Sequence, residues 1–112
     1  MPLEQHYDLQ TAAMMRAELD RFPDTCHYDD TTHKIVYHSD RDAMEAYLAL
    51  QRDEMERYRW IESEKQHADI GGHAFNDWVK RYSEQFSLYW RKTHAFIPAQ
   101  KNDPPDHDAP QP

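Results

Sequence analysis

A chain of 112 residues with 38% hydrophobic residues has the length of one small domain. Its three Trp, seven Tyr and four Phe provide large apolar surfaces for a core, which argues against a wholly disordered chain. The net charge is −8, with 13 Lys and Arg scattered among 21 Asp and Glu, and this argues against binding to nucleic acid or to an anionic membrane, because both require clustered positive charge.

The first predicted element is a short helix over residues 8–22. Asp8 is suited to cap its N-terminus, and Pro23 stands where the helix has to end. Apolar residues recur at helical spacing along one side, namely Ala12, Met15, Leu19 and Phe22.

The next segment, residues 25–38, has the composition of a small β-hairpin. Thr, Tyr, Ile and Val flank a central Asp-Asp-Thr-Thr, which is typical of a turn. The expected strands lie near residues 25–29 and 34–38. Two strands alone are only marginally stable, so the hairpin must pack against another element.

Two long amphipathic segments follow Ser39, which precedes an acidic first turn and is therefore suited to cap a helix. The first stripe is apolar except for Gln51 and consists of Met44, Tyr47, Leu48, Gln51, Met55 and Tyr58. The second is aromatic and consists of Phe75, Trp78, Val79, Tyr82, Phe86, Tyr89 and Trp90. On one continuous helix the two stripes would be offset by about 140°.

The only two glycines of the chain, Gly71 and Gly72, are adjacent and lie between the two stripes. In one interpretation a single long helix kinks there, and small residues let another backbone approach closely. In the other the helix breaks at the glycines or at Asp69, which would cap the last helix. We favour the break, which gives a helical hairpin, because a helix of more than 50 residues is improbable.

The sequence therefore predicts a mainly α protein with a short N-terminal helix, a small β-hairpin and two long amphipathic helices that form a helical hairpin or one long kinked helix. Residues 1–97 are expected to form a single small helical domain with the hairpin near 25–38. Residues 98–112 hold five of the seven prolines and are expected to form a disordered, Pro-rich, acidic tail.

One pair of residues carries a candidate metal site. Glu64 and His67 have the i, i+3 spacing that carboxylate-bridged di-iron bundles use. A single chain offers only one such pair, so a ferritin-like site for iron or zinc would need a dimer. The alternative is a solvated Glu and a surface His on an acidic helix, and our first expectation is no cofactor.

Potential zinc ligands also surround the hairpin, namely Cys26, His27, His33 and His38. Their spacing lacks the close pairs of a structural zinc site, and the adjacent Cys26 and His27 would point to opposite strand faces. Asp69, His73 and Asp77 would line one helical edge, which is more often a hydrated charged surface than a site. No motif for nucleophilic or phosphate chemistry is present, so an enzyme is not expected.

The function that these features favour is that of a small accessory or adaptor protein that binds a protein partner or a second copy of itself through its helices. A homo-oligomer or a subunit of a larger complex is expected. The interface would consist of Trp60, Ala68, Gly71, Gly72, Phe75, Trp78, Tyr82, Phe86 and Trp90. A single cysteine and the lack of long apolar runs indicate a reduced, cytoplasmic protein without a membrane span.

Overall fold

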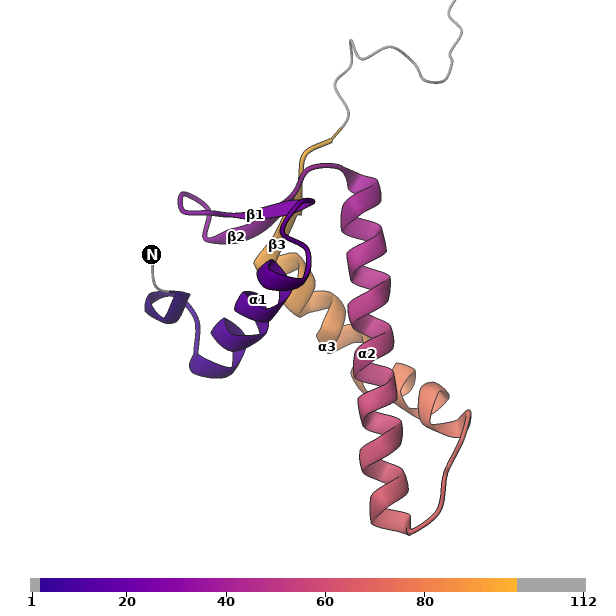
Figure 1. Cartoon of the computed structure of the whole chain (residues 1–112). Coiled ribbons are helices and arrows are strands. Elements are labelled where there is room, and N and C mark those ends of the chain that lie inside the picture. The colour runs from indigo at the N-terminus through magenta and orange to yellow at the C-terminus, as the bar shows by residue number, and fades with distance from the viewer. Residues whose placement is uncertain (1–2, 99–112) are drawn as a thin grey trace, which may run out of the picture.

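The computed structural model describes residues 3–98 of the chain. A 3-10 helix, η1 (Leu3–Gln5), precedes α1 (Leu9–Arg21), β1 (Cys26–Asp29) and β2 (Lys34–Tyr37). They are followed by α2 (Asp40–Gln66), α3 (His73–Thr93) and β3 (His94–Phe96). Figure 1 shows a small sheet with α1 beside it and the long α2 extending away, while α3 runs back from the far loop to the sheet. The predicted mainly helical fold with a small hairpin is confirmed. The predicted tail lies outside the described residues except for Pro98.

The sheet has three strands rather than the two predicted. The central strand, β2, pairs antiparallel with β1 and parallel with β3. Ile35 lies opposite His94, and Cys26 lies opposite Tyr37. A strand as short as β3 carries no periodic signal of its own, so the sequence pattern missed it. The third strand gives the hairpin the additional partner that an isolated pair of strands lacks.

The caps of the first two helices are those predicted. The Asp8 side chain accepts a hydrogen bond from the Thr11 backbone N–H at 2.7 Å, and Ser39 Oγ accepts one from the Asp42 N–H at 3.0 Å. Each cap satisfies a backbone donor that the first helical turn leaves without a partner. The entry points of both helices are therefore encoded locally.

The predicted buried face of α2 is wrong in its first half. Ala43 and Ala46 are buried, whereas Met44 and Leu48 are 57% and 50% exposed. The helix packs against β2, β3 and α3 at this end, and alanines allow closer approach than longer side chains do. A search for helical periodicity gives most weight to large apolar side chains. It therefore does not identify Ala43 and Ala46 as the residues that face the core.

The chain breaks between the two long helices, as we favoured. α2 ends at Gln66, its C-cap His67 adopts a left-handed conformation (φ 56°), and Gly71 adopts another (φ 60°). Gly72 is the N-cap of α3. A Cβ atom built on either glycine meets no atom within 4 Å. Gly71 is therefore required by its backbone conformation and does not make room for another part of this chain.

Asp69 stabilises this turn but does not cap α3. Its carboxylate accepts hydrogen bonds from the Arg59 guanidinium at 2.8 and 3.1 Å and from the Gly71 N–H at 2.9 Å. These bonds, with that from Arg59 first, lower the pKa of Asp69 to about 2. The predicted N-cap is thus replaced by a carboxylate that ties the loop back to α2.

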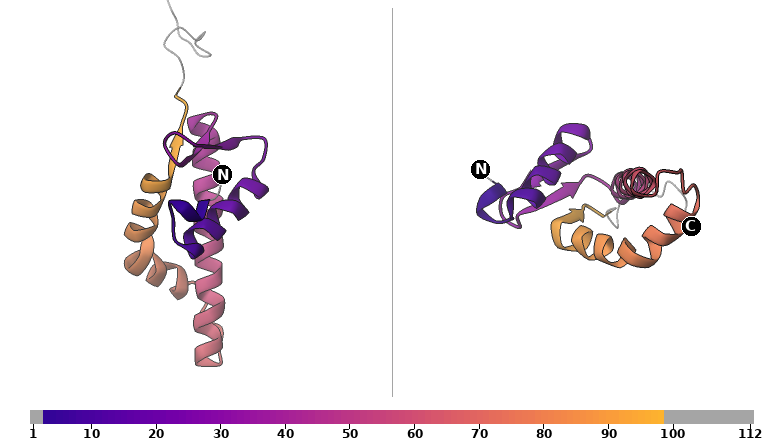
Figure 2. Two further views of the ribbon diagram at one scale, coloured as in Figure 1. Left: turned by 90° about the vertical axis from the view of Figure 1, so that its left-hand side faces the viewer. Right: turned by 90° about the horizontal axis from the view of Figure 1, so that it is seen from below.

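The aromatic stripe of α3 is covered largely by α2 of the same chain. Trp78 and Phe86 are buried. The Tyr47 ring lies 5.3 Å from that of Phe86, and the Tyr58 ring 5.5 Å from that of Tyr82 (centroid distances). Seen from below (Figure 2, right), α3 leads from the loop beside α2 to the sheet and α1. None of the described helices is both long and apolar enough to span a membrane.

Candidate functional site

An open groove separates α1 from the α2–α3 pair. α1 packs mainly against β1 and η1 rather than against the long helices. The space between them is a cavity of about 400 Å³. We call it the interhelical groove, and it is lined by Met14, Glu54, Arg57, Tyr58, Ile61, Trp78, Tyr82, Gln85, Phe86 and Tyr89.

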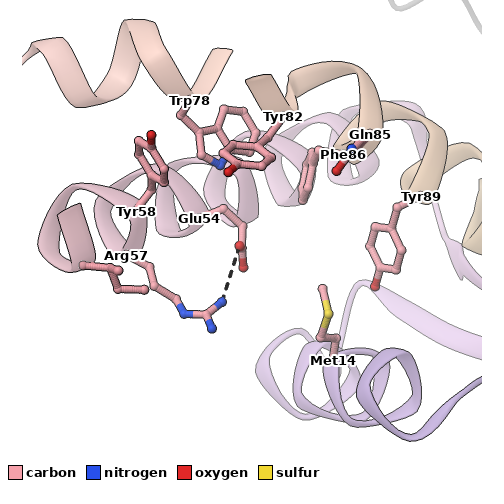
Figure 3. Close-up of a pocket in the computed structure, with 10 residues that line it drawn as sticks. Met14, Glu54, Arg57, Tyr58, Trp78, Tyr82, Gln85, Phe86 and Tyr89 are labelled. Atoms are coloured by element: carbon pink, nitrogen blue, oxygen red, sulfur yellow. Dashed lines mark ion pairs between the residues drawn. The ribbon is translucent and has the colours of Figure 1, made fainter. Parts of the chain in front are cut away.

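Aromatic side chains of α3 form one wall of the groove. Figure 3 shows Met14 of α1 facing Tyr89 of α3 across the open space. The rings of Trp78 and Phe86 lie 5.9 Å apart in an edge-on arrangement, and Tyr82 is partly exposed beside Trp78. Aromatic and methionine side chains are those that recur in protein-binding surfaces, because they provide large apolar contacts.

A second cavity of about 240 Å³ continues the groove toward the sheet. It shares Met14, Glu54, Phe86 and Tyr89 with the larger cavity and adds Ala17, Glu18, Arg21, Leu50 and Asp53. Most of its lining is apolar, and the charged groups in it are three carboxylates (Glu18, Asp53 and Glu54) and the Arg21 guanidinium. An ion pair between Arg21 and Asp53 links α1 to α2, and Glu54 pairs with Arg57 at 3.6 Å.

At the other end of the groove, a polar network joins α2 to α3. The Tyr58 hydroxyl donates a hydrogen bond to Asp77, and Arg81 Nε donates to the same carboxylate at 2.9 Å. The hydrogen bond to Asp77 raises the pKa of Tyr58 to about 12. The Tyr58 side chain therefore stays a neutral donor at neutral pH, and it holds that end of the groove in place.

Beneath the second cavity lies a buried polar network formed by Glu18, Tyr37, Thr93 and His94. Each of the four side chains is at most 5% exposed. His94 Nε2 lies 2.8 and 2.9 Å from the two Glu18 oxygens, and the Tyr37 hydroxyl donates to Glu18 at 2.5 Å. The His94 ring stacks on Trp90 with centroids 3.6 Å apart. The network joins α1, β2 and the junction of α3 with β3.

The hydrogen bonds define the role of each group in this network. Thr93 Oγ1 donates to the Tyr89 carbonyl at 2.6 Å and lies 2.7 Å from His94 Nδ1. Both ring nitrogens of His94 thus have oxygen partners: Nε2 faces the Glu18 carboxylate, and Nδ1 faces Thr93 Oγ1 and, at 3.2 Å, the Trp90 carbonyl. Burial and then the bond to Glu18 raise the pKa of Tyr37 well above its usual range, so the phenol stays protonated.

The structure places the predicted interface residues in different surroundings. Trp78, Tyr82 and Phe86 line the interhelical groove together. Trp90 lies outside it, stacked on His94, and Phe75 is half-buried on α3. The remaining residues lie away from the groove: Trp60 is 66% exposed, Ala68 and Gly72 are exposed, and Gly71 lies in the turn.

The candidate metal pair does not share a helix face. Glu64 is in the last turn of α2, whereas His67 is the left-handed C-cap, and both are exposed. Among residues 3–98 no group of three or more His, Cys, Asp or Glu side chains is placed to hold a metal ion together. A ferritin-like site for iron or zinc formed between two copies stays a prediction.

Sequence reasoning missed several groups at the groove. Glu18 did have a signal, because it lies three positions after Met15 and four before Phe22 and thus interrupts the apolar face of α1. Met14 and Glu54 lie outside the apolar stripes of their helices and carry no such signal. His94 is 76 positions from Glu18 in the chain, so no local pattern joins them.

No protein-family model matches the chain, and neither a curated protein sequence nor a solved structure matches it.

Proposed function

We propose that this protein is a small accessory or adaptor protein that binds an amphipathic helix of a protein partner in the interhelical groove. The observation that carries the proposal is the groove itself, where aromatic side chains of α3 face Met14 of α1 across a cavity of about 400 Å³. Helices of partner proteins commonly bind such grooves through apolar residues at i, i+3 or i+4, and i+7.

The dimensions of the groove suit a helix of modest length. From Trp78 to Tyr89 the wall follows α3 for about 16 Å at 1.5 Å per residue, which corresponds to roughly three turns of a partner helix. The second cavity, between Leu50 and Ala17, would receive one further apolar side chain. A helix there would pack between α1 and the α2–α3 pair and would cover the aromatic side chains that α2 leaves partly exposed.

Charge supports a partner with basic residues at the edge of its apolar face. The chain has a net charge of −8. In the second cavity Asp53 pairs with Arg21 and Glu54 with Arg57, so the attraction would come mainly from the overall charge of the chain. Opposite charges accelerate association and disfavour wrong partners more than they add affinity. Specificity would thus come from the charges, and most of the affinity from the aromatic wall.

The test uses a library of helical peptides selected for binding to the full chain. Met14→Arg introduces a charge into the groove, and Tyr82→Ala removes part of its wall. Both side chains are about 37% exposed, so neither change should unfold the protein. Met44→Arg is the matched control, because Met44 is exposed on α2 and does not line the groove.

We expect selected peptides to lose at least tenfold in affinity for both groove variants, about 1.4 kcal/mol, and to bind the control as they bind the native chain. Equal binding to all variants would refute the groove as the binding site. A dimeric native protein that becomes monomeric with Met14→Arg would replace the partner helix with a second copy of the chain. Analytical ultracentrifugation distinguishes this outcome.

A further inference from the structure

The exposed face of the sheet brings two histidines together. Side chains alternate along a strand, so Cys26 points into the core and His27 points to the other face. The backbone N–H of His38 donates to the Thr25 carbonyl at 2.9 Å, which extends the β1–β2 ladder by one residue beyond the Cys26–Tyr37 pair. His27 and His38 are therefore diagonal neighbours on the same exposed face.

Their ring nitrogens lie at the separation of two ligands of one metal ion. His27 Nδ1 is 3.1 Å from His38 Nε2, and the ring centroids are 5.2 Å apart. Metal–imidazole bonds of about 2.0–2.1 Å would subtend an angle of roughly 95–100° at an ion bound to both nitrogens. That angle lies between those of square-planar and tetrahedral coordination.

We propose that His27 and His38 form a two-imidazole chelating site for a divalent transition-metal ion, with Cu²⁺ bound more tightly than Ni²⁺ or Zn²⁺. Imidazole is a ligand that these ions prefer, whereas Ca²⁺ and Mg²⁺ prefer oxygen. No third protein ligand joins the pair within residues 3–98, so water fills the other coordination positions. The site is independent of the interhelical groove.

Metal binding replaces the hydrogen bond between the two rings. That bond places one N–H between the nitrogens, and the ion needs a lone pair from each of them. The histidine that donates the N–H must therefore carry its proton on its other ring nitrogen. Both rings are exposed, so they can turn toward the ion without disturbing the core, while the paired strands hold their backbones at a fixed separation.

The remaining candidate ligands near the hairpin do not join this site. Cys26 is buried, its thiol donates to the Phe22 carbonyl at 3.3 Å, and burial raises its pKa. His33 adopts a left-handed backbone conformation in the turn, and its ring stacks on His6 at 3.5 Å. The four-ligand zinc site considered from the sequence is thus reduced to two imidazoles.

The test is calorimetric titration of the tag-free chain with Cu²⁺ and with Ni²⁺. We expect one ion per chain at this site, and His27→Ala or His38→Ala should each weaken binding on the order of 100-fold, because a single imidazole loses the advantage of the second, linked ligand. His73→Ala is the matched control, since His73 is an exposed histidine at the start of α3, and should bind as the native chain does.

A second measurement does not depend on a variant. Substoichiometric Cu²⁺ should broaden the ring proton signals of His27 and His38 in NMR spectra and leave that of His73 sharp. Native affinity in His27→Ala with its circular dichroism intact, or broadening of the His73 ring as strong as that of His27, would overturn the proposal.

Discussion

The buried hydroxyl of Tyr37 gives the sharpest test of the core. Tyr37→Phe removes one oxygen without creating a large cavity, but it takes away a donor to the Glu18 carboxylate. Tyr37 is fully buried and Glu18 is 3% exposed, so water cannot easily replace the lost hydroxyl. A hydrogen bond to a charged group contributes about 1.5–3 kcal/mol, and we expect the free energy of unfolding to fall by about that amount.

Urea unfolding followed by circular dichroism measures this loss. With an m value of about 2 kcal/mol/M, a loss of ~2 kcal/mol lowers the midpoint by about 1 M and leaves the slope unchanged. Tyr28→Phe is the matched control on the neighbouring strand, because the Tyr28 hydroxyl makes only a long contact of 3.5 Å with His33. A double-mutant cycle with Glu18→Gln should show coupling between positions 18 and 37.

Our reasoning would be refuted by a Tyr37→Phe variant that costs no more stability than Tyr28→Phe. The same result would indicate that Glu18 does not depend on the phenol for its hydrogen bonding. An unchanged midpoint for Glu18→Gln alone would further show that the buried carboxylate contributes no net stability, which is the outcome known for some buried ion pairs.

Three further predictions concern the helical hairpin. Trp78→Ala should cost about 3–5 kcal/mol in urea unfolding because Trp78 is buried, whereas Trp60→Ala, at an exposed position, should change stability by less than about 0.5 kcal/mol. Gly71→Ala should destabilise by about 1–2 kcal/mol because φ is 60°, while Gly72→Ala, at φ −64° in open space, should be neutral or gain up to about 1 kcal/mol in the same assay. The pKa of Asp69 is lowered to about 2 from 3.8, so its contribution to stability is complete above pH 4 and disappears as the pH falls toward 2. Urea midpoints measured across that range should therefore fall for the native chain but not for Asp69→Asn. Added salt should make this fall smaller.

The parts of the fold that depend on neighbouring residues were predictable, and those that depend on distant residues were not. Asp8 and Ser39 cap helices through hydrogen bonds within three positions, so the sequence alone reveals them. The position of Met44 on the surface is set by what packs against the other side of α2, and this cannot be read from α2 itself. β3 is three residues long and exists because β2 is available beside it.

The candidate site shows the same limit. The aromatic stripe identified Trp78, Tyr82 and Phe86 as a shared surface, and the three residues do line the groove. The opposite wall comes from α1, whose Met14 lies outside the apolar face that the sequence pattern identified on that helix. To predict a groove between elements far apart in the chain, one must know the angle at which those elements pack. The helical periodicity of the sequence gives no information on that angle.

The parallel pairing of β3 with β2 has a consequence for synthesis on the ribosome. Glu18 is translated before its partner His94, which follows it by 76 residues. Until then the nascent chain holds a two-stranded hairpin and a carboxylate on the inner face of a helix, with neither the last strand nor the imidazole to complete them. We therefore expect the buried network to close only after residue 94 has been made, and a chain terminated before that residue to be more sensitive to proteases than the full chain.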